Sequence, residues 1–402
     1  PDYVATSGTL TFTPGQTSQP VSVNVNGDTT FEPDETFFVN LTSPTNATIG
    51  DNQGVGTITN DDSPAISGHA GYCITPATNV PGVSINVTGS QTTSTATDPS
   101  GNYSINLPAG GSYTLTPTKS ALPTGSGGIN TVDVLSAQSQ FLGRTTLSGC
   151  RLTAADANGD ASVNTIDVIA IQRFALGMNT GTANVGQWRF SPVSQTYSNL
   201  SADQSGQNYD ALVIGDINGD LTPAGPNSDQ GNPAAAAQVA PSSPSGVPFV
   251  ATVSLPVASV GTSVTNFTLP MKTSAINSIN NLIGFQGDFS FDSSVVIFQG
   301  TPASAAGLTA TNWNVSANVI GAGTIKTLRI SAFSNDFTPL SGSGTLFNLN
   351  FTRVSNTPGA NTALTWALSP NNFAFIDGLL NTSVPGSTPA GSITISAAPT
   401  AA

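Results

Sequence analysis

This sequence is organised around the stretch Asp156-Ala157-Asn158-Gly159-Asp160-Ala161-Ser162-Val163-Asn164-Thr165-Ile166-Asp167. Oxygen-bearing side chains stand at positions 1, 3, 5, 9 and 12, and Ser162 at position 7 can offer its backbone carbonyl. A hard cation such as calcium needs oxygen ligands at this spacing. Ala161 replaces the glycine that is usual at position 6, where a left-handed backbone costs an alanine roughly 1 kcal/mol. The stretch predicts a calcium loop with ligands from Asp156, Asn158, Asp160, Ser162, Asn164 and Asp167.

The residues after this loop predict a helix, and the loop–helix pair occurs twice. Val168 to Leu176 has apolar residues at helical spacing, and Gly177 stands where a left-handed residue would end the helix. The segment from Asn130 to Gly143 aligns with the segment from Asn164 to Gly177 at a constant offset of 34 residues. Such a duplication indicates one structural unit used twice.

Two loop–helix units in tandem resemble a dockerin module, which implies bound calcium and a cohesin domain as partner. The first loop departs from the pattern, because Leu122, Thr124 and Ser126 fall where Asp or Asn should stand. We therefore expect one good calcium site at residues 156–167. A second, degenerate site would keep fewer ligands, among them Asn130 and Asp133.

A third acidic run, Gly215-Asp216-Ile217-Asn218-Gly219-Asp220, repeats the start of the calcium loop. Its twelfth position is Asn227 instead of a carboxylate, and Pro223 and Pro226 disfavour a helix after it. The run resembles a stretch that trails dockerin-like repeats in some secreted bacterial surface proteins. Two interpretations stay open: a third calcium site held by Asp216, Asn218 and Asp220, or a turn that binds nothing.

The composition indicates several β-rich domains in an acidic protein. The chain has 402 residues, of which 8% are charged, and its 41 Gly and 28 Pro suit strands joined by turns. A net charge of −13 excludes electrostatic attraction to nucleic acid or to an anionic membrane, and it suits the binding of divalent cations. The sequence has no apolar run of about 18 residues, so we expect no membrane insertion.

Cys73 and Cys150 are the two cysteines of the sequence. In a chain of low charge that is rich in Thr and Ser, secretion and a Cys73–Cys150 disulfide are the favoured interpretation. The alternative is two buried free thiols. A disulfide here would join two neighbouring predicted domains.

Residues 1–63 are predicted to form short strands, with alternating patterns at Gly8–Phe12, Val21–Val25, Thr36–Leu41 and Gly54–Ile58. The run from Asp28 to Phe37 and the closing Ile58-Thr59-Asn60-Asp61-Asp62 are similar to a Calx-beta domain, an immunoglobulin-like sandwich whose acidic loops can bind calcium. A solvated acidic loop is the alternative. The resemblance implies four candidate ligands: Glu32, Asp34, Asp61 and Asp62.

The Calx-beta resemblance covers only the second half of such a domain. A half-sandwich leaves sheet edges and an apolar face uncovered. We expect either sequence ahead of Pro1 or a strand donated by another molecule to cover them. Donated strands are one way in which subunits join.

Residues 64–119 are predicted to form a second small β-sandwich. The segment from Thr97 to Ile105 predicts a hairpin in which Asp98 caps the turn and Tyr103 points into the core. Together with Pro81-Gly82-Val83, this segment resembles the carboxypeptidase regulatory-like or Cna-B-like fold. That resemblance implies a spacer without catalytic residues of its own.

The dockerin-like module is assigned to residues 120–231, and it includes a long loop with the aromatic residues Trp188, Phe190, Tyr197 and Tyr209. Exposed aromatic side chains can stack on sugars, but we expect this loop to pack on the calcium module. Residues 232–246 are rich in Ala, Pro and Ser, which predicts a linker.

Residues 247–402 form the last predicted domain. The segment from Gly284 to Val295 and the strand from Gly342 to Phe351 resemble two sequence phrases of cohesin domains. The resemblance spans nearly the whole of this domain. It implies a jelly-roll-like sandwich.

The residues that most catalytic sites need are missing. His69 is the single histidine, which leaves no Ser-His-Asp triad and no zinc site of His and Cys. No phosphate-binding glycine loop precedes a helix. The acidic residues cluster in calcium-type loops, which disfavours a glycosidase pair. We therefore expect no enzyme.

The sequence thus predicts a mainly β protein of tandem sandwiches, immunoglobulin-like and jelly-roll-like, with one small α-helical calcium module. We expect a secreted structural protein of the bacterial surface or matrix. Its copies would join into a filament through donated strands or through contacts between cohesin-like and dockerin-like units. Those two units could instead dock within one molecule. The alternatives are an adhesin or scaffold that binds a polysaccharide or a dockerin-bearing protein, and a spacer stalk.

Overall fold

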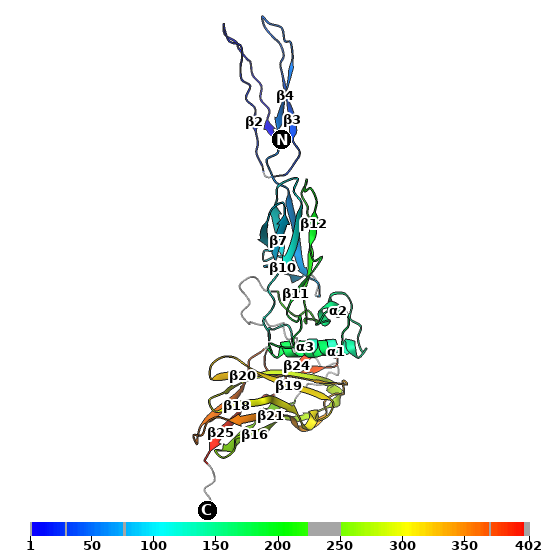
Figure 1. Ribbon diagram of the computed structural model, residues 1–402, viewed down its shortest axis with the longest axis vertical. Coiled ribbons are helices and arrows are strands. Elements are labelled where there is room, and N and C mark those ends of the chain that lie inside the picture. The colour runs from blue at the N-terminus through cyan, green and yellow to red at the C-terminus, as the bar shows by residue number, and fades with distance from the viewer. Residues whose placement is uncertain (1, 29, 75–77, 224–250, 370, 398–402) are drawn as a thin grey trace, which may run out of the picture. The chain divides into compact units, whose positions relative to one another are not determined.

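The computed structural model describes residues 2–28, 30–74, 78–223, 251–369 and 371–397 (Figure 1). Strands dominate and helices are few, which confirms the predicted mainly β fold. The chain divides into two compact units. The first comprises the residues up to Ala70, Pro81–Thr118 and Ser191–Tyr209. The second comprises Gly71–Val80, Lys119–Phe190 and the residues from Asp210 onward.

These units cut across the predicted domain boundaries. Residues 191–209, assigned from sequence to the dockerin-like module, belong to the first unit, because β12 (Gln195–Tyr197) pairs there with β10 (Tyr113–Thr118). Residues 71–80, predicted as part of the second sandwich, belong to the second unit. The predicted linker at 232–246 lies outside the described residues.

The N-terminal part of the first unit consists of two ribbons of two strands each, in contact through the rings of Tyr3 and Phe37, whose centroids are 5.1 Å apart. β1 (Tyr3–Val4) pairs with β2 (Asn24–Val25), and β3 (Glu35–Asn40) pairs with β4 (Gln53–Ile58). The predicted strand at residues 8–12 does not form, since no backbone ladder joins it to another described segment. None of the described residues before Pro64 is buried. These ribbons therefore leave their apolar side chains on the surface, as expected of half a sandwich.

The rest of the first unit is a small β-sandwich with a core of its own. Its strands are the first residues of β5 (Ala65–Tyr72), then β7 (Ser84–Gly89), β8 (Thr93–Ala96), β9 (Asn102–Asn106), β10 and β12. Tyr103 is buried in this core, as predicted. Asp98 Oδ1 accepts hydrogen bonds from the N–H groups of Ser100 and Asn102, which is the predicted turn cap.

The second unit contains the helices α1 (Thr131–Phe141), α2 (Gly149–Ala155) and α3 (Thr165–Ala175). Asn130 and Asn164 begin α1 and α3 with the same capping box, in which the Asp three residues later bonds back to the cap N–H. Gly143 and Gly177 follow these helices with φ of 68° and 76°, the left-handed residues that end them. The duplication at an offset of 34 residues is therefore a repeat of structure. The short strands near the helices are β6 (Thr78–Asn79), β11 (Trp188–Ser191) and β13 (Tyr209–Val213).

The second unit ends in a two-sheet sandwich. One sheet has the order β14 (Val253–Ser254), β16 (Asn266–Ile276), β21 (Gly342–Arg353), β18 (Val296–Ala305). The other has the order β15 (Val257–Gly261), β25 (Gly391–Ser396), β22 (Asn361–Trp366), β17 (Leu282–Asp292), β20 (Ile325–Ser334), β19 (Trp313–Ile320). Off this path, β23 (Ala374–Asp377) pairs with β17, and β24 (Thr382–Ser383) pairs with β23. Fully buried phenylalanines fill the space between the sheets, and Phe285 stacks on Phe347 with ring centroids 5.5 Å apart.

Candidate metal centre

The contiguous loop, residues Asp156 to Asp167, turns tightly around its first carboxylate. Asp156 Oδ1 accepts hydrogen bonds from the N–H groups of Gly159 (2.8 Å) and Asp160 (3.1 Å), and its Oδ2 accepts one from Ala161 (2.9 Å). Ala161 has a φ of 68°, the left-handed conformation that the spacing predicts at position 6.

Asp167, in the first turn of α3, closes this loop. Its Oδ1 accepts from the N–H of Asn158 (3.1 Å) and its Oδ2 from the N–H of Asn164 (2.9 Å). Asp160 accepts from the Ser162 hydroxyl (2.6 Å) and the Asn158 amide (2.8 Å), and these bonds lower the pKa of Asp160. The candidate ligands of the contiguous loop thus lie together in one hydrogen-bonded turn.

A second set of acidic side chains comes from two distant parts of the sequence. Asp133, in the first turn of α1, meets Asp216 and Asp220 from the loop after β13, and one carboxylate oxygen of each lies within 4.8 Å of the others. Asp156, Asp160 and Asp167 form no group as close as this. The sequence assigned the members of the second set to two separate sites, a degenerate loop and a third acidic run. The structure joins them into one, which we call the split site: Asn130, Asp133, Asp216, Asn218 and Asp220.

The split site repeats hydrogen bonds of the contiguous loop. The N–H of Gly219 donates to Asp216 Oδ1 at 2.8 Å, as Gly159 does to Asp156. The N–H of Asn218 donates to Asp133 Oδ1 at 3.2 Å, as Asn158 does to Asp167 at 3.1 Å. Both glycines have a φ of 77°. Residues 216–220 therefore supply the first half of the loop that residues 122–126 fail to provide.

The donor chemistry of the split site suits a hard divalent cation. Calcium binds oxygen at 2.3–2.6 Å, so two of its ligand oxygens are at most about 5 Å apart, which the carboxylate spacing of 4.8 Å satisfies. Asp133 and Asp216 are fully buried. Burial and the charges of Asp220 and Asp216 raise the pKa of Asp133, and burial raises the pKa of Asp216 to about 7. Like charges buried together are costly unless a cation neutralises them.

Tyr72 and Cys73 attach residues 71–80 to this site. The Tyr72 hydroxyl donates to Asp216 Oδ2 at 2.6 Å. The predicted Cys73–Cys150 disulfide is present, with Cα atoms 6.2 Å apart, and ties this segment to α2. Both cysteines lie in the second unit, so the disulfide is a crosslink within that unit and does not join two domains as predicted. Sequence spacing gave no signal for Tyr72, because its partner Asp216 is 144 residues away.

Part of the predicted aromatic loop packs beside Tyr72. The Trp188 ring meets the Tyr72 ring edge-on with centroids 6.0 Å apart, and it stacks on Phe190 at 6.4 Å. The ammonium of Lys119 lies 5.5 Å from the Trp188 ring centroid. These contacts are the packing expected of the loop for Trp188 and Phe190. For Tyr197 and Tyr209 the expectation is wrong, because both belong to the first unit, where Tyr197 pairs with Tyr113 and the Tyr209 hydroxyl donates to the carbonyl of Leu115 at 3.1 Å.

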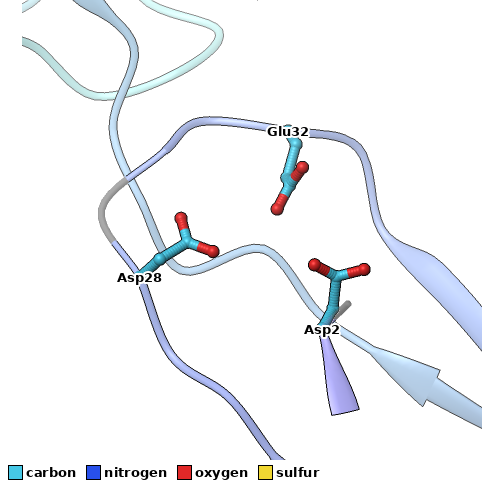
Figure 2. A group of neighbouring side chains, drawn as sticks. All are labelled: Asp2, Asp28 and Glu32. Carbon is cyan, nitrogen blue, oxygen red and sulfur yellow. The ribbon is translucent and has the colours of Figure 1, made fainter.

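A third acidic group lies in the N-terminal ribbons, where the carboxylates of Asp2, Asp28 and Glu32 approach one another (Figure 2). The pairing of β1 with β2 brings this group together. The N–H of Asn26 donates to the Asp2 carbonyl, which places residue 2 beside the residues that follow β2. Sequence reasoning missed Asp2, because only knowledge of that pairing places residue 2 beside residue 28. The group is partly exposed, and exposed acidic groups are common without an ion.

Of the four ligands implied by the Calx-beta resemblance, only Glu32 belongs to this group. Asp34 Oδ1 instead accepts from the N–H of Asn60 at 2.8 Å. Asp61 and Asp62 also lie outside it. Among the described residues these four side chains form no common acidic group, and Asp34 instead caps the backbone of Asn60 at the open end of the β3–β4 ribbon.

Helix α1 lies along the sandwich of the same unit, against β17 and β20 (Figure 1). The N–H of Thr131 donates to Gln286 Oε1, and its hydroxyl bonds to Ser331 Oγ, each at 2.9 Å. Two turns on, Gln138 Nε2 donates to the carbonyls of residues 334 and 335 at 3.1 and 3.0 Å. Every α1 residue from Thr131 to Ser139 is buried. The helix is thus buried over these nine residues and contacts the sheet through β17 and β20.

Helix α3 reaches the sandwich with its C-terminal half. Gln172 Nε2 donates to Asn314 Oδ1 on β19 at 3.1 Å. Asn318 Nδ2, on the same strand, donates to the carbonyl of Leu176 at 2.9 Å and so satisfies one of the free carbonyls at the helix end. Both repeats of the helical module therefore contact one sheet.

Arg329 on β20 anchors the loop that precedes α1. Its Nε and Nη2 bond to both oxygens of Asp288 at 2.9–3.2 Å, and the pair is largely buried. The remaining Nη1 donates to the carbonyl of Gly125 at 2.8 Å. A guanidinium can satisfy three acceptors in this way because its donors form a rigid planar fork.

Residues 1–62 match the family model of the Calx-beta domain, which confirms the resemblance predicted for residues 1–63. No curated protein matches the chain. The solved structures with similarity to the chain include cohesin modules. One is a type I cohesin–dockerin complex from Clostridium thermocellum, with 10% sequence identity over 36% of this chain and 99% of that chain and a TM-score of 0.30. Another is a type III cohesin of a cell-surface anchoring scaffoldin from Ruminococcus flavefaciens, with 15% identity over 38% of this chain and 91% of that chain and a TM-score of 0.29. A cohesin module of a family 33 glycoside hydrolase from Clostridium perfringens has 14% identity over 38% of this chain and 100% of that chain, with a TM-score of 0.29.

The chain thus contains a segment that matches the Calx-beta family model, and it has similarity to cohesin modules. Among the described residues, no helix is both long and apolar enough to span a membrane.

Proposed function

We propose that this protein is a non-enzymatic structural subunit of an extracellular assembly, in which calcium holds the helical module in the form that docks on the sandwich. The observation that carries the proposal is the contact of α1 and α3 with β17, β20 and β19 in one unit. It gives the helical module a partner within the chain. A docked pair of this kind is suited to serve as a rigid building block.

Calcium has a structural role in this proposal. The contiguous loop begins α3 and the split site begins α1, and these are the two helices that contact the sandwich. A cation at the split site would neutralise three crowded carboxylates and tie α1 to residues 216–220. Because a ligand that binds only the folded form stabilises it by mass action, calcium would strengthen the docked state.

A sandwich that receives a dockerin-bearing protein is the alternative expected from the sequence. If such a protein used the sheet face that α1 and α3 cover, both helices would have to leave it. Displacement would break the bonds of Thr131 and Gln138 and expose a helix that is buried from residue 131 to 139. These costs favour the structural role over a receptor for a foreign partner.

Copies of the chain would join through the N-terminal ribbons. Phe12, Phe38 and Val55 are 54%, 56% and 63% exposed, and both ribbons have two strands each. A strand from a neighbouring copy would pair with a free ribbon edge and cover part of this apolar surface. A head-to-tail contact of that kind extends into a filament when its rotation does not close into a ring.

Negative-stain microscopy of the purified chain, with calcium and after chelation, tests the proposal. We expect filaments in calcium that fray or disappear when calcium is removed. The double variant Asp133→Asn/Asp216→Asn should fail to form them in calcium, whereas the control Asp98→Asn, a turn cap in the first unit, should behave as the unaltered protein does. Isolated particles under every condition would refute assembly, and filaments indifferent to chelation would refute the role of calcium.

A further inference from the structure

We propose that Tyr72 is a positioning residue for the split calcium site: its hydroxyl holds Asp216, so that calcium binding there depends on the segment 71–80. This inference rests on the proposed function, because it assumes that the split site binds calcium. It assigns a role to a residue that supplies no ligand itself and lies far from the loop in sequence.

The hydroxyl of Tyr72 has a fixed direction. Tyr72 is 1% exposed, and its oxygen accepts a hydrogen bond from the N–H of Val213 at 3.3 Å. The hydroxyl proton is therefore directed to the second partner, Asp216 Oδ2, at 2.6 Å. The ring is held in turn by its edge-on contact with Trp188. Tyr72 thus fixes one oxygen of Asp216 from outside the loop.

The contiguous loop has no counterpart of this bond. Asp156, which occupies the same position there, accepts hydrogen bonds only from the backbone of residues 159–161 within the described contacts. In the split site, Asp216 and Asp133 belong to segments that no short loop connects, so local chain geometry alone does not set their separation. A hydrogen bond to a ligating carboxylate orients it, and the loss of such a bond typically weakens metal binding by about 10- to 100-fold.

The described residues beside Tyr72 are themselves anchored. Gly71 and Tyr72 pair with β6, and the N–H of Cys73 donates to the carbonyl of Ala211 at 2.9 Å. Cys73 is also bonded to Cys150 on α2. The position of the Tyr72 hydroxyl is therefore set by a disulfide-stapled segment next to the residue, and the disulfide acts on the split site through Tyr72.

Calcium titration by calorimetry tests this role. The background variant Asp156→Asn/Asp160→Asn disables the contiguous loop and leaves the split site to be measured alone. In that background, Tyr72→Phe keeps the ring and removes the hydroxyl, and we expect calcium affinity to fall by about tenfold. The matched control is Tyr113→Phe, which removes a hydroxyl that bonds to the Pro108 carbonyl in the first unit, and it should leave the affinity unchanged.

A second measurement does not depend on the folding of a Tyr72 variant. Reduction of the Cys73–Cys150 disulfide in the background protein should weaken calcium binding at the split site, with the far-ultraviolet dichroism unchanged. In an Asp133→Asn/Asp216→Asn background, which leaves the contiguous loop to be measured alone, the same treatment should weaken calcium binding less.

The outcomes separate this inference from the proposed function. If Tyr72→Phe lowers the melting temperature of the calcium-free protein but leaves calcium affinity within twofold, Tyr72 only packs and the inference is wrong. If the background protein binds no calcium while the contiguous loop does, the split site itself fails. If the unaltered protein binds no calcium at either place, the proposed function fails as well.

Discussion

Leu135 of α1 rests on the bare backbone of Gly284 in β17. A Cβ on residue 284 would lie 2.7 Å from Leu135 Cδ1 and 3.3 Å from the carbonyl oxygen of Ala332, closer than unstrained carbon contacts allow. The absence of a side chain at Gly284 is therefore what lets the helix approach the sheet this closely. Gly284 in the sequence phrase of this strand therefore has a packing role, because it makes room for α1 on the sheet.

The first prediction concerns this contact. Gly284→Ala should destabilise the docked helix by about 1–3 kcal/mol, the usual cost of overpacking, and should increase amide exchange in α1. Urea unfolding combined with hydrogen exchange measures both. Gly300→Ala is the matched control, since a Cβ there would meet nothing within 4 Å. Equal effects of the two substitutions would contradict the close approach of α1.

The second prediction concerns the buried ion pair. Arg329→Met leaves the Asp288 carboxylate without its cation and the Gly125 carbonyl without a donor, so unfolding free energy should fall by about 3 kcal/mol. Adding Asp288→Asn should recover part of this loss. Arg151→Met, at an exposed position of α2, is the control and should have little effect. Additive losses in the double variant would argue against coupling between Arg329 and Asp288.

The third prediction concerns the number of calcium ions. Asp133→Asn and Asp167→Asn should each reduce the stoichiometry from two ions to one, because each removes a carboxylate from one site and keeps an oxygen for the helix cap. Calcium at 100 times its dissociation constant should stabilise the unaltered protein by about 2.7 kcal/mol per site. Calorimetry and thermal melts measure these quantities. An unchanged stoichiometry in Asp133→Asn would contradict the split site.

The fourth prediction concerns the disulfide. Cys73 and Cys150 are 77 residues apart, and in the chain-entropy description a crosslink of that length stabilises by about 4 kcal/mol. The double variant Cys73→Ala/Cys150→Ala should lose a comparable amount in urea unfolding. A reducing agent should destabilise the unaltered protein and leave the variant unaffected. A reducing agent that destabilises both equally would show that its effect lies elsewhere.

The fifth prediction separates assembly from folding. Phe38 is 56% exposed on β3, so Phe38→Ser should leave the melting temperature of the isolated chain nearly unchanged and should abolish filaments. The control is Val193→Ser, where the side chain is 77% exposed outside the ribbons. Filaments that survive Phe38→Ser would exclude the ribbon face as the joining surface.

Local features were predictable from the sequence. The spacing of Asp156 to Asp167, the caps Asn130 and Asn164 and the terminal glycines depend on neighbours within one turn or loop, and the structure has them in place. The strand patterns of the last domain were readable for the same reason, since alternation reflects burial on one sheet face.

Long-range partners were not predictable in this way. The duplication predicts the first half of this loop upstream of Asn130, where Leu122 and Ser126 stand, whereas residues 216–220 supply it from far downstream. A signal was present: residues 216–220 repeat the pattern of residues 156–160, and the segment that begins at Asn130 lacks that half. Tyr72, Asp2 and the docking of α1 on the sheet left no such trace, because each depends on pairings across distant parts of the chain.

The split site also sets an order of events during synthesis. The contiguous loop is complete once residue 167 has been made, whereas the split site waits for Asp216 and Asp220. A chain interrupted before residue 216 would carry the start of α1 with half of its ligands. On the proposal that calcium fills the split site, the ion would fix the start of α1 only in chains that have been extended past residue 220.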